Sequence, residues 1–419
     1  MQVMELHYRS IKKIPELCVP AGNFKILKYA VEYGADAVYA GGPMFNLRTL
    51  QDNFMVAEIE TAVQYAHKMK KKFYLTLNAI ISENEIGDFS SYLEKIKNIG
   101  FDAIIASDPG AIKIIKNVLP DTRIHISTQA SISNHEAVNF WGSLGASRVN
   151  IARELGLDEI NKICSKSDIE VEVFVHGALC ISYSGRCMLS KYLSNRDANK
   201  GKCSHTCRWK YYLMEEKRPN TFFPVDQDRR GTYIYNSRDL CLIDRLDEIV
   251  DAGVDGIKIE GRMKTENYVS SVTWAYRQAL DLIKRGKYNN AKKASLLKEL
   301  DKTTHRTFTS GFMFNNSKKS SPELADNDNV GYIKKYRFAG SVTGFSEQYD
   351  GPVILARNQV KINDILDILQ PGKNPVKFKL VKMVNAKSGQ PADVCNTNDS
   401  FIICGLGKIN DMSLVKVKL

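Results

Sequence analysis

Four cysteines crowd one short stretch of the chain, and their spacing is the strongest chemical signal in the sequence. Six, fifteen and three residues separate them, and they lie among glycine, serine and arginine rather than in an apolar pattern. Four thiolates can hold either a tetrahedral zinc ion or an iron-sulfur cluster. Zinc ribbons favour two tight pairs and only one pair is tight here, so the spacing predicts a metal site and leaves the metal open. The predicted ligands are Cys180, Cys187, Cys203 and Cys207.

The other cysteines are interpreted differently. Cys241 ends the segment that carries the four ligands, so it could approach them in space and replace Cys207 as the fourth ligand. The rest lie in apolar patterns that are typical of small core residues; they are Cys18, Cys164, Cys395 and Cys404. The total is nine, an odd number, which a complete disulfide framework would not leave.

The same stretch is also basic and aromatic. The chain carries 59 Lys and Arg against 47 Asp and Glu, a net charge of +12. Between Cys180 and Lys210 lie seven basic residues and one acidic residue, with tyrosines and a tryptophan interleaved. Basic groups neutralise phosphates and aromatic rings stack on unpaired bases, so this composition indicates RNA binding. The residues that we expect to contact RNA are Lys202, Arg208 and Lys210.

Peptide hydrolysis is an alternative chemistry for this stretch. A cysteine nucleophile with His176 as its base is conceivable from the residue types alone. However, the sequence contains no GxSxG elbow, no HExxH zinc motif and no Walker loop. His176 also ends an apolar run, where a structural hydrogen-bonding role explains it equally well.

Eight short apolar runs alternate with amphipathic segments from Glu16 to about Val269. The runs are ELCVPAG, ADAVYAGG, KKFYLTLN, FDAIIAS, RIHISTQ, SRVNIAR, VEVFVHG and DGIKIEG. Eight such units in a row predict an α/β fold, a closed TIM-type (β/α)8 barrel. A doubly wound open sheet is the alternative, but it usually has fewer strands, and no GxGxxG follows any of these runs.

One insertion interrupts the predicted barrel. About 80 residues separate strand seven, Val171–Val175, from strand eight, Gly256–Ile259, which is far more than a usual loop. This Cys-rich insertion, about 178–255, holds all four predicted ligands. Segments that follow barrel strands lie on the C-terminal face, where such folds place their active sites. The insertion after strand seven is therefore the predicted functional region.

The rest of the chain divides into domains by composition. The barrel domain is expected over 1–315, a polar linker over 316–329, and a small C-terminal all-β domain, a barrel or sandwich, over 330–419. The N-terminal segment lacks the apolar core of a signal peptide, and no apolar run approaches the length of about 18 residues that a membrane span needs. We therefore expect a cytoplasmic protein with no membrane partner.

Several motifs together resemble the collagenase-like peptidase family, U-32. They are ELCVPAGNFKILKYAVEYGADAVYAGG, NIARELGL, EVFVHGALC with GRCMLS, and IKIEGRMK, which are spread over most of the chain. The better understood members of this family carry a [4Fe-4S] cluster on these cysteines. They hydroxylate transfer RNA, ribosomal RNA or a quinone precursor without oxygen. The CxxxC pair followed by RWKYY, the HRTFTSGF segment and the β-rich C-terminus are most similar to the tRNA branch.

The resemblance implies a tRNA-modifying enzyme that uses prephenate to convert the wobble uridine to 5-hydroxyuridine on its iron-sulfur cluster. A peptidase, as the family name suggests, and hydroxylation of ribosomal RNA or another substrate are the alternatives. A zinc-stabilised RNA-binding protein without catalysis would explain the cysteines and the charge but not the active-site face of the barrel. The expected partners are tRNA and a small anionic co-substrate, and a paralogous partner subunit is left open.

Charged and polar residues at predicted strand ends could serve this chemistry. Prephenate carries two carboxylates, and an arginine binds a carboxylate through two parallel hydrogen bonds. The arginines that follow predicted strands two, six and eight, and that we expect to bind the substrate, are Arg48, Arg153 and Arg262. The residues at equivalent positions that we expect to hydrogen-bond a base or the substrate, as catalytic residues, are Gln129, His176 and Glu260.

Overall fold

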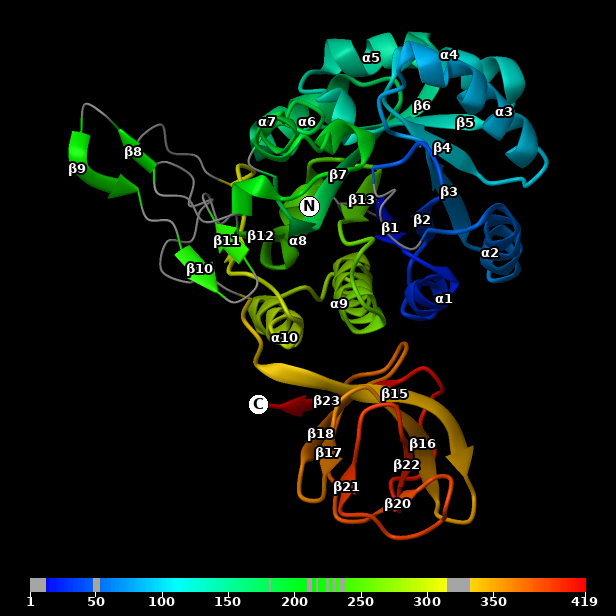
Figure 1. Ribbon diagram of the computed structural model, residues 1–419, viewed down its shortest axis with the longest axis vertical. Helices are drawn as coiled ribbons and strands as arrows, with labels where there is room; N and C mark the ends of the chain where they lie inside the picture. Colours follow the sequence, from blue (N-terminus) through cyan, green and yellow to red (C-terminus); the bar gives the residue numbers. More distant parts are fainter. Residues whose placement is uncertain are drawn as a thin grey trace, which may run out of the picture.

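Eight parallel strands form a closed barrel in the computed structural model (Figure 1). The structure describes residues 13–47, 53–180, 182–208, 213–215, 218–223, 226–228, 231–233, 238–314 and 332–419. Each strand pairs with the next in chain order, and the last strand, β13, pairs with both β7 and β1 and so closes the ring. The barrel strands are β1 Glu16–Pro20, β2 Ala37–Gly41, β3 Lys72–Thr76, β4 Ala103–Ala106, β5 Arg123–Ile126, β6 Ala146–Asn150, β7 Glu170–Ala178 and β13 Gly256–Ile259.

A helix follows each barrel strand on the outside of the ring. Polar side chains cap the first turns of several of these helices: the Asn23 side chain accepts from the Ile26 amide, and the Asp108 side chain accepts from the Ala111 amide. No helix in the described ranges is both long and apolar enough to cross a membrane. The helices are α1 Phe24–Glu32, α2 Val56–Lys68, α3 Ile86–Ile96, α4 Pro109–Val118, α5 His135–Ser143, α6 Leu157–Lys166, α8 Leu246–Asp251 and α9 Glu266–Lys284, with α10 Asn290–Leu300 after them.

The predicted fold class is confirmed. All eight apolar runs form the barrel strands, and the insertion follows β7 as expected. Within the insertion, β12 pairs antiparallel with the extended end of β7, and Figure 1 shows β8 to β11 to one side of the barrel. The elements of the insertion before α8 are α7 Leu189–Ser194, β8 Leu213–Glu215, β9 Arg218–Phe223, β10 Asp226–Asp228, β11 Gly231–Tyr233 and β12 Asp239–Cys241. The strand β14 Phe308–Thr309 follows α10 and pairs with β12.

The C-terminal part of the chain is an antiparallel sheet with a core of its own, as the turn signals predict. Seven strands pair in the order β19-β18-β23-β15-β16-β22-β20, and their buried side chains form a separate cluster. The predicted linker, 316–329, lies outside the described residues, so the domain boundaries stay predictions. The seven strands are β15 Tyr336–Ser346, β16 Gly351–Ala356, β18 Ile365–Leu369, β19 Val376–Lys379, β20 Met383–Asn385, β22 Ser400–Ile403 and β23 Leu414–Lys418. Two further strands, β17 Val360–Lys361 and β21 Val394–Cys395, pair with each other.

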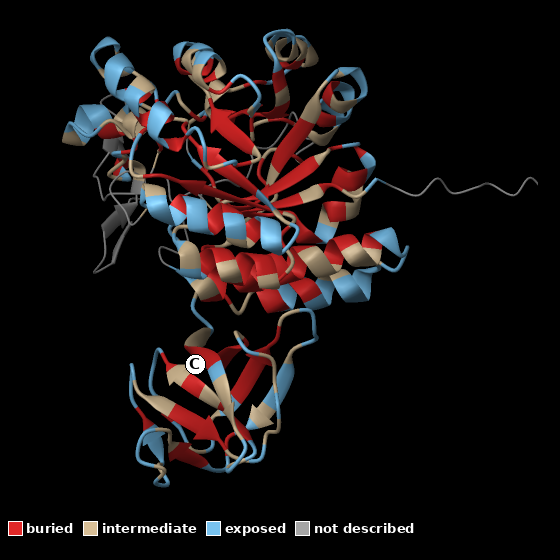
Figure 2. Cartoon of the chain, turned by 90° about the vertical axis from the view of Figure 1, so that its right-hand side faces the viewer, coloured by how far each residue is buried: buried red, intermediate tan, exposed pale blue. Residues whose placement is uncertain are grey.

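The C-terminal sheet packs against helices of the barrel (Figures 1 and 2). The Tyr33 hydroxyl, at the end of α1, donates to the Leu369 carbonyl at 2.9 Å. The Lys416 ammonium, which is fully buried, lies 2.8 Å from the Glu299 carboxylate of α10. Figure 2 shows buried residues along the barrel strands, on the inner faces of the helices and inside the C-terminal sheet. Specific polar contacts therefore hold the two parts in one arrangement.

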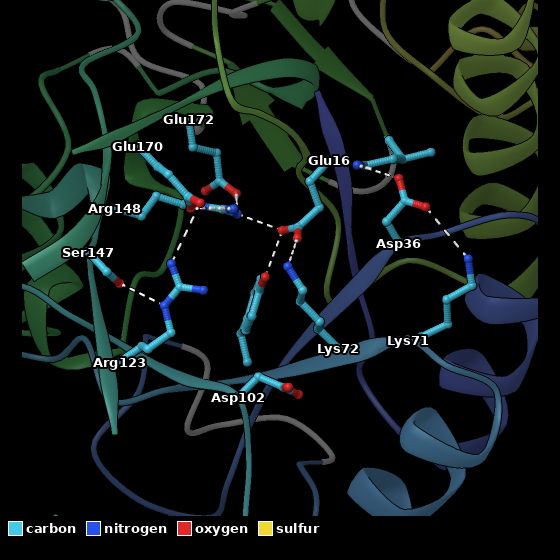
Figure 3. A network of polar contacts seen from close by, with 12 residues as sticks. Glu16, Asp36, Lys71, Lys72, Asp102, Arg123, Ser147, Arg148, Glu170 and Glu172 are labelled. Atoms are coloured by element: carbon cyan, nitrogen blue, oxygen red, sulfur yellow. Dashed lines mark hydrogen bonds and ion pairs between the residues drawn. The ribbon is translucent and has the colours of Figure 1, made fainter. Parts of the chain in front are cut away.

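The barrel interior carries charged residues as well as apolar ones (Figure 3). The Arg148 guanidinium of β6 lies 2.6 Å from the Glu16 carboxylate and 2.7 Å from the Glu170 carboxylate. The Glu172 carboxylate of β7 lies 2.8 Å from the Lys258 ammonium of β13. Burial acts to raise the pKa of Glu16 and Glu172, but the facing cations hold both below the ordinary value of 4.5. The buried charges are thus paired across strands.

Candidate functional site

A cavity of about 520 Å³ opens at the C-terminal ends of the barrel strands. Barrel residues and residues of the Cys-rich insertion both line it, and this is the face where TIM barrels place their active sites. A second cavity, of about 270 Å³, lies beside Tyr33 and Gly372 and is lined by no thiol. The first cavity is lined by all four predicted metal ligands, which are Cys180, Cys187, Cys203 and Cys207.

The loop 180–187 is fastened to the barrel by Arg153, which follows β6. Its guanidinium donates from Nη1 to the Ala178 carbonyl at 3.1 Å and from Nη2 to the Ser184 hydroxyl at 2.8 Å. Burial acts to lower the pKa of Arg153, but the neighbouring Cys180 thiol and nearby carboxylates hold it above its ordinary value. Arg153 therefore stays charged beside the first predicted ligand.

The same loop lies directly against the end of β5. The Ser131 hydroxyl donates to the Ser184 carbonyl at 2.7 Å. Gly185 has a φ of +79°, and a Cβ at this position would lie 2.4 Å from the Gln129 carbonyl oxygen. Only glycine permits both this backbone conformation and this close approach. The GRC sequence thus sets how near the loop comes to the barrel mouth.

The second pair of cysteines is held by a cluster of serine hydroxyls. The Ser204 hydroxyl lies 2.9 Å from that of Ser190 and 2.6 Å from that of Ser194, both in α7. The backbone amide of His205 donates to the Cys203 sulfur at 3.4 Å. These contacts shape the turn that presents the CxxxC pair to the cavity.

An ion pair anchors the insertion to the loop after β3. The Lys200 ammonium lies 2.7 Å from the Glu85 carboxylate and 3.0 Å from the Ser82 hydroxyl. Hydrogen bonds from Lys200 and Ser82 lower the pKa of Glu85 to about 2. The Asn199 side-chain Nδ2 donates to the Cys187 carbonyl at 3.3 Å, so this anchor lies close to a predicted ligand. The insertion therefore reaches across from β7 to the other side of the barrel mouth.

The four cavity thiols fit a metal centre, and the structure separates the two candidates for the fourth ligand. Cys207 lines the cavity, whereas Cys241 lies in β12, opposite His176 of β7, and is buried. Burial raises the pKa of Cys241 to about 12, which keeps it a neutral thiol. Among the described residues no three Cys, His, Asp or Glu side chains already form a metal-binding group. The cavity thiols would have to draw together around the metal, and thiolates suit zinc and iron-sulfur clusters alike.

Arg262 projects into the same cavity from the segment after β13. Its guanidinium donates to the Thr76 hydroxyl at 2.6 Å and to the Asn46 side-chain oxygen. A Cβ on Gly41, at the end of β2, would lie 2.6 Å from the Arg262 Nη1. Glycine at this strand end therefore makes room for the guanidinium. The structure brings Arg262 and Arg153, two of the three predicted anion-binding arginines, to one cavity.

Two of the three predicted catalytic residues also line the cavity. Gln129 lies in the short helical turn after β5, and Glu260 directly follows β13. The Glu260 amide donates to the His176 carbonyl at 2.8 Å, and a Cβ on Gly177 would lie 2.6 Å from the Glu260 carbonyl oxygen. The backbone of β7 thus packs tightly under Glu260 and sets its position at the barrel mouth.

His176 does not line the cavity. Its ring is buried among Tyr268, Tyr276 and Phe308, with centroid distances of 5.9, 5.6 and 5.7 Å. Burial lowers the pKa of His176 to about 3, so the ring is neutral at physiological pH. The nearest described partner of its Nδ1 is the Tyr276 hydroxyl, at 3.5 Å. This environment is that of a structural histidine that packs β7 against α9.

Of the remaining predicted residues, only Lys202 has a side chain that the structure describes. Arg48, the side chain of Arg208, and Lys210 lie outside the described residues. Lys202 is exposed on the insertion and does not line the cavity. Its position on the outer surface is compatible with a contact to a large partner rather than with a small molecule in the cavity.

Lys258 is a cavity residue that the sequence patterns did not reveal. It lies in β13 with its side chain 6% exposed, paired to Glu172, and it lines the cavity together with Asn150. The Asn150 amide donates to the same Glu172 carboxylate at 2.7 Å. A lysine within an otherwise apolar strand, IKI, was the available signal, because such a position faces either solvent or the barrel interior.

Comparison with known proteins gives the family. The chain matches Peptidase family U32 over residues 22–323 and the Peptidase family U32 C-terminal domain over residues 334–415. It is 35% identical over 415 residues to tRNA hydroxylation protein P of Escherichia coli (strain K12), covering 89% of this chain and 90% of that protein. It is 36% identical over 365 residues to tRNA hydroxylation protein P1 of Bacillus subtilis (strain 168), covering 87% and 85%. The solved structure of the U32 peptidase Mk0906 is 14% identical, with a TM-score of 0.40, over 61% of this chain and 96% of that one. The chain therefore belongs to peptidase family U32 and has that family's C-terminal domain.

Proposed function

We propose that this chain is a tRNA-modifying enzyme. In this proposal it hydroxylates the wobble uridine to 5-hydroxyuridine without molecular oxygen, using prephenate and a [4Fe-4S] cluster. The observation that carries the proposal is the cavity that all four clustered thiols share with Arg153 and Arg262. Relatives named tRNA hydroxylation proteins, at 35% and 36% identity over most of both chains, support the same substrate class.

The charge of the cavity lining suits a small anionic co-substrate. The described lining includes one carboxylate, Glu260, and four cationic side chains, Arg153, Lys258, Arg262 and Lys264. Because Glu172 neutralises Lys258, the positive excess belongs to the other three. Each guanidinium can bind a carboxylate through two parallel hydrogen bonds. A dicarboxylate such as prephenate therefore suits the two arginines.

The thiols would hold the redox centre beside this anion site. When bound to Cys180, Cys187, Cys203 and Cys207, a [4Fe-4S] cluster would supply one-electron chemistry. Arg153 contacts the loop that carries two of these thiols, so the same side chain would orient the co-substrate and position the ligand loop. In this proposal the cavity brings the anion site and the thiols into one space.

Neutral and acidic groups on the cavity would orient the base. Gln129 offers both a donor and an acceptor, which matches the edge of a uracil ring. Glu260 offers an acceptor from the neighbouring part of the lining. We assign His176 no contact with substrate, because it is buried away from the cavity and uncharged.

The outer surface of the insertion supports binding of a polyanion. The segment that lines one side of the cavity carries three exposed cations, which are Lys191, Arg196 and Lys202. Cations at the edge of a concave site attract phosphates and position the RNA without reading its sequence. The basic surface and the thiol cavity would then act on one RNA molecule.

The experiment that tests the proposal is complementation of a strain that lacks this gene. Nucleosides from digested tRNA are measured by mass spectrometry, and anaerobically purified protein is analysed for iron, zinc and sulfide. We expect the wild-type gene to restore 5-hydroxyuridine, Cys203→Ser to abolish it, and Cys404→Ser, outside the cavity, to have no effect. Unchanged tRNA with an altered ribosomal RNA nucleoside would move the substrate to ribosomal RNA. Unchanged RNA together with peptide cleavage by the purified protein would favour a peptidase.

A further inference from the structure

Two tyrosines line the candidate cavity and nevertheless remain exposed. Tyr183 is 48% exposed and Tyr332 is 39% exposed, whereas Tyr39, which lines the same cavity, is 6% exposed. The cavity therefore extends from a buried aromatic side chain to an aromatic rim that solvent reaches. An exposed aromatic ring on the edge of a concave site is a common feature of sites that receive a flat, unpaired base.

The two rings reach the rim from distant parts of the chain. Tyr183 belongs to the loop 180–187, between the first two cavity thiols. Tyr332 precedes the C-terminal sheet, and its neighbour Ile333 exchanges backbone hydrogen bonds with His305, at 2.7 and 3.3 Å. This bridge holds the start of the C-terminal part against the barrel. The C-terminal part of the chain thus contributes a side chain to the site.

A cation accompanies one of these rings. The Lys264 ammonium lies 5.2 Å from the centroid of the Tyr332 ring and 4.9 Å from that of the buried Tyr268 ring. Lys264 also lines the cavity. An aromatic face with a fixed ammonium beside it suits a nucleotide, because the base can stack while the phosphate is neutralised. The two arginines already suit the carboxylates of a small co-substrate, and the exposed rings match a flat base.

We infer that Tyr183 and Tyr332 form the stacking surface on which an extruded uracil base rests as it enters the cavity. The inference rests on the proposed function and adds the residues that would receive the base. Uracil is flat and uncharged, and when it leaves its stack in the RNA, aromatic side chains can replace the stacking that it gives up. Placing the base between an insertion loop and the C-terminal part would bring it to the thiol-lined space below.

A binding experiment with two RNAs tests this role. One RNA is an anticodon stem-loop with uridine at the wobble position, and the other has an abasic nucleotide there. Anaerobically purified full-length protein is compared with Tyr183→Ala/Tyr332→Ala and with Tyr183→Phe/Tyr332→Phe, which keeps both rings. Tyr192→Ala is the matched control, because Tyr192 belongs to the same insertion and is 83% exposed but does not line the cavity.

We expect the double alanine variant to bind the uridine RNA roughly five- to hundredfold more weakly than wild type does, the range for removal of one base stack. Its affinity for the abasic RNA should change little, and the phenylalanine variant and Tyr192→Ala should bind like wild type. Equal losses on both RNAs, or no loss on either, would overturn the stacking role while leaving the proposed function intact. Failure of the wild-type protein to bind either RNA would overturn the proposed function, and this inference with it.

Discussion

The Lys258 ammonium lies 2.8 Å from the Glu172 carboxylate inside the barrel, and Lys258 also lines the candidate cavity. The two side chains are 6% and 2% exposed, so solvent does little to screen their charges. Arg148 also approaches Glu172, at 3.4 Å, and continues the ionic network toward the other end of the barrel. The stability of the barrel is thus coupled to a residue of the site.

Lys258→Met should lower the free energy of unfolding by about 3 to 5 kcal/mol, because it removes the nearer of the two cations that pair with the buried Glu172 carboxylate. Lys258→Met/Glu172→Gln should recover part of this loss. Lys97→Met is the control, since the Lys97–Glu94 pair is exposed and its removal should cost at most about 1 kcal/mol. Urea denaturation measures the free energy of unfolding of the wild type and of the three variants. Equal stability of Lys258→Met and wild type would show that the pair contributes nothing to the barrel.

The same pair should make stability depend on pH in the acidic range. Burial raises the pKa of Glu172, but Lys258 and Arg148 outweigh it and hold the pKa below 4.5. The contribution of a group with a lowered folded pKa is complete above the unfolded value and is lost as the pH falls through the folded value. Between neutral pH and this acidic range, wild type should therefore lose more stability than Lys258→Met/Glu172→Gln. Parallel curves of unfolding free energy against pH would contradict this expectation.

Arg262→Ala should weaken prephenate binding roughly ten- to hundredfold, since losing a charged hydrogen-bonding group costs about 1.5 to 3 kcal/mol. Arg262→Lys should restore little, because an ammonium lacks the planar fork. Calorimetric titration of the anaerobic protein measures both, with the exposed Arg357→Ala as the control. Arg153→Ala is the less clean test, because it also removes hydrogen bonds to Ala178 and Ser184 and should reduce metal content. Wild-type affinity in Arg262→Ala would show that Arg262 does not bind the carboxylates of prephenate.

Cys207→Ser should lose the bound metal, and Cys241→Ser should keep it. Cys207 lines the cavity with the other three thiols, whereas Cys241 is buried opposite His176. Iron, zinc and acid-labile sulfide are measured on anaerobically purified proteins. The reverse pattern would assign the fourth ligand to Cys241. Stoichiometric zinc with neither iron nor sulfide in the wild-type protein would reject the cluster and favour a zinc-stabilised site.

Glu85→Gln should loosen the insertion and expose its thiols. The Lys200–Glu85 pair, at 2.7 Å, ties the insertion to the loop after β3, and Lys200 follows Asn199, which contacts the Cys187 carbonyl. In metal-free protein at neutral pH, alkylation of Cys187 should therefore be faster in Glu85→Gln than in wild type. Glu83→Gln is the matched control, because Glu83 is exposed and lies two residues away on the same turn. Identical rates in both variants would show that the ion pair does not restrain the cysteine loop.

Replacing Lys202, Arg208 and Lys210 together with Ala should weaken tRNA binding and flatten its salt dependence. For every phosphate that the variant no longer neutralises, the slope of log K against log salt should fall by about 0.7 to 0.9. Thermal unfolding should change little, because Lys202 is exposed and the sequence predicts the other two cations in a surface loop, where substitutions cost little stability. Filter binding over a range of salt concentrations measures the slope. Unchanged affinity and slope would mean that these residues only solvate the insertion.

Local patterns were enough to predict the barrel, and they also indicated the cysteine-rich segment, whose role as a metal site stays a prediction. Each strand run, such as FDAIIAS or RIHISTQ, carries its own apolar signal between helix-forming segments, and eight consecutive units admit few arrangements other than a closed ring. The spacing of the cysteines in a polar, glycine-containing loop likewise predicts a metal site from the local sequence alone. Arg153, Arg262, Gln129 and Glu260 line one cavity because the strand ends of a parallel barrel meet on one face, and their roles there stay predictions.

Only the tertiary structure decided the environments that depend on distant neighbours. His176 and Cys241 look like candidate functional residues by type, but antiparallel pairing of β7 with β12 buries them side by side. Lys258 looks like one polar residue in an apolar strand, but ring closure places it against Glu172, 86 residues earlier in the chain, and at the cavity. Tyr183 and Tyr332 share a cavity only because the C-terminal part folds back against the barrel. Burial, pairing and pKa are set by contacts between segments far apart in sequence, which residue types and spacing do not encode.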